Sequence, residues 1–128
     1  MKIRRFVENH HVLMSAWAAE NPNMPDARDM NHYRCVFRWK RRSMTVFFSM
    51  GLAHTREPRA DEVLHCLAMD ASGVDNATGF EDWCSNYGYD TDSRKAERIY
   101  KTCQRQAKKL RQFCGSAEVY QQLLECEE

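Results

Sequence analysis

Two stretches in the first half of the chain alternate apolar and polar residues, which is the pattern of a half-buried β-strand. In the stretch 32–39, one face carries Tyr33, Cys35, Phe37 and Trp39, and the other carries His32, Arg34 and Arg38. In the stretch 44–50, one face carries Met44, Val46, Phe48 and Met50, opposite Thr45 and Ser49. The short basic segment between them predicts a hairpin with a basic tip.

Residues 1–25 fit two periods, because the apolar residues at 6, 7, 13, 14 and 17 suit a helix and those at 12, 14, 16 and 18 suit a strand. We interpret this region as extended, with a third strand over residues 11–19. Two strands alone are only marginally stable in water, so a third strand and covering helices are expected. The run Asn21-Pro22-Asn23-Met24-Pro25 predicts a loop, because proline restricts its predecessor and lacks an amide proton.

The second half of the chain has helical periodicity, with apolar residues at spacings of three and four. The pattern predicts a first helix that begins at Pro58 and ends at Gly73. A second, short helix lies between a capping box, Thr78 with Glu81, and Gly88. A third runs roughly from residue 93 to 114 and ends at Gly115, and Ser116 caps a last helix whose contacts are Val119, Tyr120, Leu123 and Leu124.

These elements predict an α+β fold in which a small antiparallel N-terminal sheet of two or three strands is packed by three or four C-terminal helices. We expect one domain over residues 1–128, mainly β over 1–55 and mainly α over 58–128, because 128 residues suit a single core. No apolar run is long enough for a membrane span or a signal-peptide core, so we expect a cytoplasmic protein that does not contact membranes.

Six cysteines, at positions 35, 66, 84, 103, 114 and 126, do not form a C-x-x-C pair, and we expect a protein without an export signal. We interpret them as free thiols that serve as small hydrophobic residues. Cys66, Cys103 and Cys114 fall on the helical apolar stripes, which indicates core positions.

The formal net charge of +1 hides a segregated pattern. Residues 28–59 hold eight basic and two acidic residues, whereas residues 60–93 hold eight acidic residues and no lysine or arginine. Residues 94–111 again hold eight basic residues against one acid, and residues 112–128 hold four acids and no base. The blocks contain apolar residues throughout, so they indicate charged faces of folded elements.

The long predicted helix carries a second stripe, made of cations at spacings of 4, 3, 4 and 3: Arg94, Arg98, Lys101, Arg105 and Lys108. Such a stripe is usually a solvated face, but like charges at these spacings repel, and Glu97 is the only acid in the helix. We therefore give equal weight to two interpretations of the stripe, a solvated face and a binding surface for an anionic partner. The basic hairpin tip, Lys40, Arg41 and Arg42, is a further candidate for partner binding.

Motifs for catalysis and for cofactors are absent from the sequence. There is no nucleophile elbow, P-loop or dinucleotide fingerprint, and Ser49, His54 and His65 do not stand out from ordinary residues. Asp90, Asp92 and Glu97 superficially suggest a calcium loop, but Arg94 occupies a ligand position, which favours helix capping. We therefore expect no cofactor and no metal, and a protein that is not an enzyme; an enzyme with an unrecognised site is the third alternative.

One segment, Phe80-Glu81-Asp82-Trp83-Cys84-Ser85-Asn86-Tyr87-Gly88-Tyr89-Asp90-Thr91-Asp92-Ser93-Arg94-Lys95-Ala96-Glu97, resembles a signature of small proteins of unknown function encoded by bacteriophages and prophages. The segments 32–35, 44–51 and 63–68 have the same order and similar spacing in that group, so the resemblance covers roughly residues 15–115. It implies an accessory phage protein in the bacterial cytoplasm and no particular catalytic residue.

Small phage accessory proteins often inhibit host machinery, CRISPR defence included, so the first hypothesis is a counter-defence or host-takeover protein. It would bind and inhibit a host protein complex, for example a CRISPR effector, and so be an anti-CRISPR protein. The alternative is a small nucleic-acid-binding protein that uses the basic helix and the basic hairpin tip.

Overall fold

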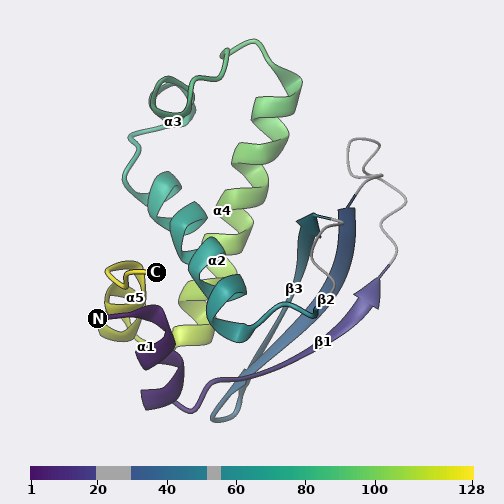
Figure 1. Ribbon diagram of the computed structural model, residues 1–128. Coiled ribbons are helices and arrows are strands. Elements are labelled where there is room, and N and C mark those ends of the chain that lie inside the picture. Colours follow the sequence, from purple (N-terminus) through teal and green to yellow (C-terminus); the bar gives the residue numbers. More distant parts are fainter. Residues whose placement is uncertain (20–29, 52–55) are drawn as a thin grey trace.

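The computed structural model describes residues 1–19, 30–51 and 56–128 (Figure 1). The elements in order are α1 (Ile3–Asn9), β1 (Leu13–Ala19), β2 (Met30–Trp39), β3 (Arg42–Gly51), α2 (Ala60–Asp75), α3 (Phe80–Tyr87), α4 (Arg94–Cys114) and α5 (Ala117–Leu124). A three-stranded antiparallel sheet forms the N-terminal half, and four helices follow it. The α+β fold class is confirmed. The loop predicted at residues 21–25 lies outside the described residues.

The sheet has the strand order β1-β2-β3, and its register decides which side chains share a face. Phe37 pairs with Met14 on one side and Met44 on the other, and all three point towards the helices. Cys35 and Phe37 are fully buried. The alternation that predicted β2 and β3, and the third strand predicted within residues 11–19, are therefore confirmed.

The core lies between the inner face of the sheet and the helices, which all lie on the same side of the sheet (Figure 1). The Phe113 ring of α4 packs edge-on against Phe37 and Trp39, with centroid distances of 6.2 and 6.3 Å. Leu64 of α2 and Leu110 of α4 have no exposed surface. Because α4 contacts both the sheet and α2, it is the central element of the core.

Residues 3–9 form the helix α1, which corrects the extended conformation expected there, whereas residues 13–19 are extended as expected. Ile3 and Phe6, three residues apart, are both buried, so they anchor one side of α1 in the core. The backbone N–H of Ile3 donates to the carbonyl of Glu127 at 2.7 Å, which places the two chain ends side by side (Figure 1). The helix depends on this contact with distant residues, which local periodicity does not reveal.

Gly73 lies inside α2 and does not end it, which is a second correction, because the helix continues to Asp75. The Tyr87 ring of α3 lies directly against Gly73, in the space that a side chain would need. The glycine therefore serves close packing of two helices. The helix also begins at Ala60, with Arg59 as its N-cap, so Pro58 precedes the first turn.

The predicted capping box of Thr78 and Glu81 is wrong. The N-cap of α3 is Gly79, so the third helical residue is Asp82, and its carboxylate accepts the backbone N–H of Thr78 at 3.0 Å. The predicted caps at Gly88, Gly115 and Ser116 are confirmed, and Ser93 is the N-cap of α4. Ser93 and Ser116 accept backbone N–H groups at the starts of α4 and α5, and Gly88 and Gly115 adopt the left-handed conformation after α3 and α4, with φ of 74° and 77°.

All six cysteines are free thiols. Cys103 and Cys114 are buried, as predicted for core positions, but Cys66 is exposed, so its assignment to the core is wrong. Cys66 lies on α2 outside the arc formed by the buried residues Val63, Leu64, Leu67, Ala68 and Ala71. It therefore faces solvent.

Candidate binding surfaces

The structure brings the five predicted cations of α4 onto one exposed side of the helix, which we call the basic face: Arg94, Arg98, Lys101, Arg105 and Lys108. The opposite side of α4 is buried through Ala96, Cys103, Ala107 and Leu110. At a rise of 1.5 Å per residue, the 21 residues of α4 extend over about 31 Å. The basic face is thus a long row of cations directed away from the core.

Acidic residues neutralise little of the basic face. Lys101 pairs with Glu97 at 2.9 Å, and this ion pair lowers the pKa of the Glu97 carboxyl. Arg105 donates to the hydroxyl of Thr102 at 3.1 Å, which orients the guanidinium without cancelling its charge. Among the ion pairs of residues 1–19, 30–51 and 56–128, the Lys101–Glu97 pair is the only one that includes a member of the basic face.

The hairpin tip, Lys40, Arg41 and Arg42, is packed against the C-terminal end of α4. The side chains of Lys40 and Arg42 lie over the Trp39 ring, 5.0 and 5.2 Å from its centroid. The guanidinium of Arg42 also lies close to Gly115, the C-cap of α4. A cation is favourable there because the helix dipole is negative at that end. Arg42 thus has a structural role beside any role in binding.

A shallow groove of about 450 Å³ joins the tip to the basic side of α4. Its lining includes Arg42, Thr45 and Lys109, and the Lys109 ammonium donates to the backbone carbonyl of Thr45 at 3.3 Å. The groove therefore links Arg42 of the tip to Lys109, which follows Lys108 of the basic face along α4.

A second surface, which the sequence did not single out, is the open sheet face: Leu13, Trp17, Arg34, Val36, Arg38 and Phe47. Trp17, Arg34 and Phe47 are direct neighbours in one row across the three strands. The exposed fractions of Leu13, Trp17 and Phe47 are 68, 46 and 65 %. Alternation in the sequence predicts this face for Arg34 and Arg38. It does not single out Leu13 and Trp17, which also fit a helical stripe, or Phe47, because an apolar residue on the outer face carries no sequence signal that separates it from a core residue.

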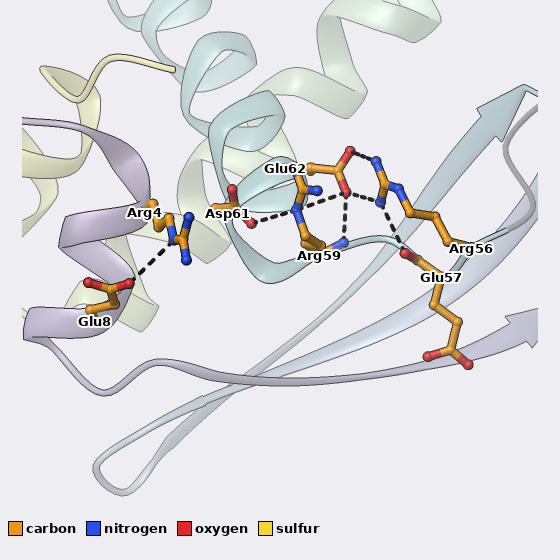
Figure 2. Close-up of polar contacts among 7 residues, drawn as sticks. All are labelled: Arg4, Glu8, Arg56, Glu57, Arg59, Asp61 and Glu62. Carbon is orange, nitrogen blue, oxygen red and sulfur yellow. Dashed lines mark hydrogen bonds and ion pairs between the residues drawn. The ribbon is translucent and has the colours of Figure 1, made fainter.

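The acidic block at residues 60–93 is largely explained by local structure. The Glu62 carboxylate forms two hydrogen bonds with Arg56, at 2.6 and 2.8 Å, and accepts the backbone N–H of Arg59 at 2.9 Å (Figure 2). These bonds lower the pKa of Glu62 to about 2. They fasten the segment before α2 to the first turn of that helix.

Another acidic residue, Asp75, ties three helices together. Arg111 of α4 donates to it at 2.9 Å, and the Tyr120 hydroxyl of α5 also donates to its carboxylate. Burial, together with this bond to a carboxylate, raises the pKa of Tyr120. Asp75 thus has a role in the fold, and it does not form part of a free acidic surface.

The signature segment 80–97 builds a corner between α3 and α4, which we call the signature corner. Trp83 is buried and stacks on Tyr89, with a centroid distance of 5.2 Å and an interplanar angle of 6°. Phe80 and Tyr100 pack against the same ring system. Gly88 ends α3 and Ser93 caps α4. Each of these residues has a packing or capping role.

Burial affects the reactivity of the cysteine thiols. Burial raises the pKa of Cys103 to about 11 and that of Cys114 to about 12, which disfavours the nucleophilic thiolate. The exposed Cys66 also has a raised pKa, because of desolvation and the neighbouring Asp70. Ser49 accepts or donates a bond of 2.7 Å with His32, its cross-strand partner. His54 lies outside the described residues.

Within the described ranges, no group of three or more histidine, cysteine or acidic side chains is placed to hold a metal ion. In the same part of the chain, no helix has the length and apolar character needed to cross a membrane. No family model matches the chain, and neither a curated protein nor a solved structure is detectably similar to it.

Proposed function

We propose that the protein is a phage-encoded accessory protein that binds a host protein complex and inhibits it by occupying a surface, without catalysing a reaction. The observation that carries this proposal is the basic face of α4, five exposed cations in a row, of which only Lys101 forms an ion pair with an acid of the described residues. Holding like charges at these spacings is unfavourable, and an acidic partner surface would relieve the repulsion.

The phage origin rests on the resemblance of the segment 80–97, and the inhibitory role rests on analogy with small phage accessory proteins. Counter-defence is the proposed setting, and a CRISPR effector is the first complex to test. The long reach of the basic face suits an extended acidic surface on such a complex, because the cations follow a straight helix.

Affinity capture from the bacterial host, with and without nuclease, tests the proposal. The wild-type protein is expected to retain a protein partner after nuclease treatment. The charge-reversed variant Lys101→Glu/Arg105→Glu is expected to lose that partner. A matched control is Arg4→Glu/Arg5→Glu, which changes the net charge equally on α1, where both arginines are exposed.

Circular dichroism and urea unfolding of both double variants show whether the fold is retained. If the α4 variant is folded and still captures and inhibits the same partner, the basic face is a solvated surface and the proposal is wrong. Equal losses with the α1 control would show a nonspecific charge effect and would contradict it as well.

A second candidate function is duplex nucleic-acid binding by the basic face and the hairpin tip, favoured by the groove that joins Arg42 and Lys109. If about five cations neutralised phosphates, the slope of log affinity against log salt would be about −4.5, and affinity would fall roughly 500-fold between 50 and 200 mM salt. A partner that is lost with nuclease, together with this salt dependence, would favour the second candidate over the first.

A further inference from the structure

The open sheet face presents aromatic rings to solvent in an ordered row. Trp17 on β1 and Phe47 on β3 flank Arg34 on β2, and each is directly opposite its neighbour in the register. The Arg34 guanidinium carbon lies 5.1 Å from the centroid of the Trp17 ring, so the cation and the ring hold each other in place. The helices cover the other face of the sheet (Figure 1).

The charge of this face has one sign. The three strands Leu13–Ala19, Met30–Trp39 and Arg42–Gly51 contain no aspartate or glutamate. Arg34 and Arg38 are exposed on the open face, on either side of Val36. A ligand that suits this face must therefore be negatively charged and must also carry flat or apolar groups that can pack on the rings of Trp17 and Phe47.

A second copy of this chain does not meet that requirement, because two such faces in contact would oppose the arginines of one copy to those of the other. An acidic peptide supplies the charge but not a regular series of flat rings. Single-stranded nucleic acid supplies both, since every base has a π-face and every nucleotide a phosphate.

We propose that the open sheet face binds single-stranded nucleic acid, with bases stacked on Trp17 and Phe47 and phosphates near Arg34 and Arg38. The two rings lie on strands separated by two strand spacings, about 10 Å, so each ring takes its own base. This activity is separate from the proposed function, because it uses the sheet and leaves the basic face of α4 unoccupied.

Fluorescence anisotropy at 50 mM salt tests the proposal, with labelled oligomers of twelve thymidines and of twelve uridines as probes. Trp17→Ala and Phe47→Ala are each expected to weaken binding about 5- to 150-fold, the loss of one stacked base. The control Met69→Ala removes an exposed apolar side chain from α2 and is expected to leave the affinity unchanged. The more tightly bound of the two oligomers tells whether DNA or RNA is preferred.

An abasic oligomer of the same length separates stacking from charge. It has the same number of phosphates but no bases. Its affinity for the wild-type protein is expected to be low, and equal to the affinity of the thymidine oligomer for the double variant Trp17→Ala/Phe47→Ala. Equal affinity for the abasic and thymidine oligomers would show attraction by charge alone, for example through α4, and would overturn the proposal.

Tryptophan fluorescence gives an independent signature, because Trp39 and Trp83 are buried and Trp17 is exposed. Stacking of a base on Trp17 is expected to quench the emission of the wild-type protein. Trp17→Phe is expected to remove the quenching while keeping the affinity within about threefold, since a phenyl ring also stacks.

Three further outcomes would overturn the proposal: no binding of either oligomer, tighter binding of a duplex than of the single strand, or ring variants that weaken only an acidic peptide such as polyglutamate. The proposed inhibition of a host complex is tested separately, with variants of Lys101 and Arg105. Tighter binding of a duplex would in addition favour the second candidate function.

Discussion

The signature corner and the open sheet face are built from the same kinds of residue in opposite environments. In the corner, Trp83 has an exposed fraction of 3 % and is packed among other aromatic rings. On the sheet, Trp17 is about half exposed and Phe47 is largely exposed. The recognisable signature thus maps to residues that hold the fold together. The segment also carries exposed groups, because Tyr87, Tyr89 and Arg94 of the basic face belong to it. The open sheet face lies outside the segment altogether.

The largest expected effect comes from replacing Trp83 of the corner and Trp17 of the sheet by alanine, in separate variants, and comparing their stabilities. Trp83→Ala is expected to cost about 3 to 5 kcal/mol of unfolding free energy, because it leaves a large cavity between α3 and α4. Trp17→Ala is expected to cost less than about 1 kcal/mol, because its ring is already half exposed. Urea unfolding measures both. Similar losses for the two variants would contradict the distinction between the corner and the face.

Leucine truncations extend the same test to the central helices. Leu67→Ala and Leu110→Ala are each expected to cost about 2 to 5 kcal/mol, since both side chains are buried in the core between α2 and α4. Leu13→Ala, on the open sheet face, is the matched control and is expected to change stability by less than about 0.5 kcal/mol. A silent Leu110→Ala would mean that the buried side of α4 is assigned wrongly.

The end of α4 is expected to depend on glycine. Gly115→Ala forces a side chain into a left-handed backbone with φ of 77° and towards the guanidinium of Arg42, at an expected cost of about 1 to 2 kcal/mol. Gly79→Ala is the control, because its backbone is extended and its surroundings are open. Thermal unfolding compares the two. An equal effect at both positions would disprove the specific role of Gly115.

The smallest expected effect concerns acid stability. The folded-state pKa of Glu62, about 2, lies below its usual value of 4.5. Its stabilising contribution, about 1 to 2 kcal/mol, is therefore fully present above about pH 4.5 and is lost as the pH falls towards 2.

Urea unfolding between pH 7 and pH 2.5 measures this effect as the difference between wild type and Glu62→Gln, which is expected to shrink as the pH falls. Glu81→Gln is the control, because Glu81 also lies in the first turn of a helix but has no ion pair among those of the described residues. A difference that is independent of pH would contradict the role of the Glu62 charge.

Local patterns in the sequence predicted most of the elements. Alternation in residues 32–39 and 44–50 predicts β2 and β3, and the capping residues Gly115 and Ser116 predict the end of α4 and the start of α5. These signals suffice because strand alternation and helix caps are set by near neighbours. The predictions for Gly73 and Thr78 are wrong. Gly73 makes room for the Tyr87 ring of another helix, and α3 begins after Gly79, so Thr78 is not its N-cap. Neither fact can be predicted from the few residues around each position.

The fold class, the strands of the hairpin, the long helix and its cationic stripe could be predicted from the sequence, because each depends on residues a few positions apart. Tertiary structure alone decided three things: that Ile3 and Phe6 make a helix by packing at the chain ends, that the hairpin tip meets the end of α4, and that Trp17, Arg34 and Phe47 align across the sheet. Each of these depends on contacts between distant residues, and the register of three strands fixes the last one. The candidate surface for nucleic acid is therefore a property of the folded sheet.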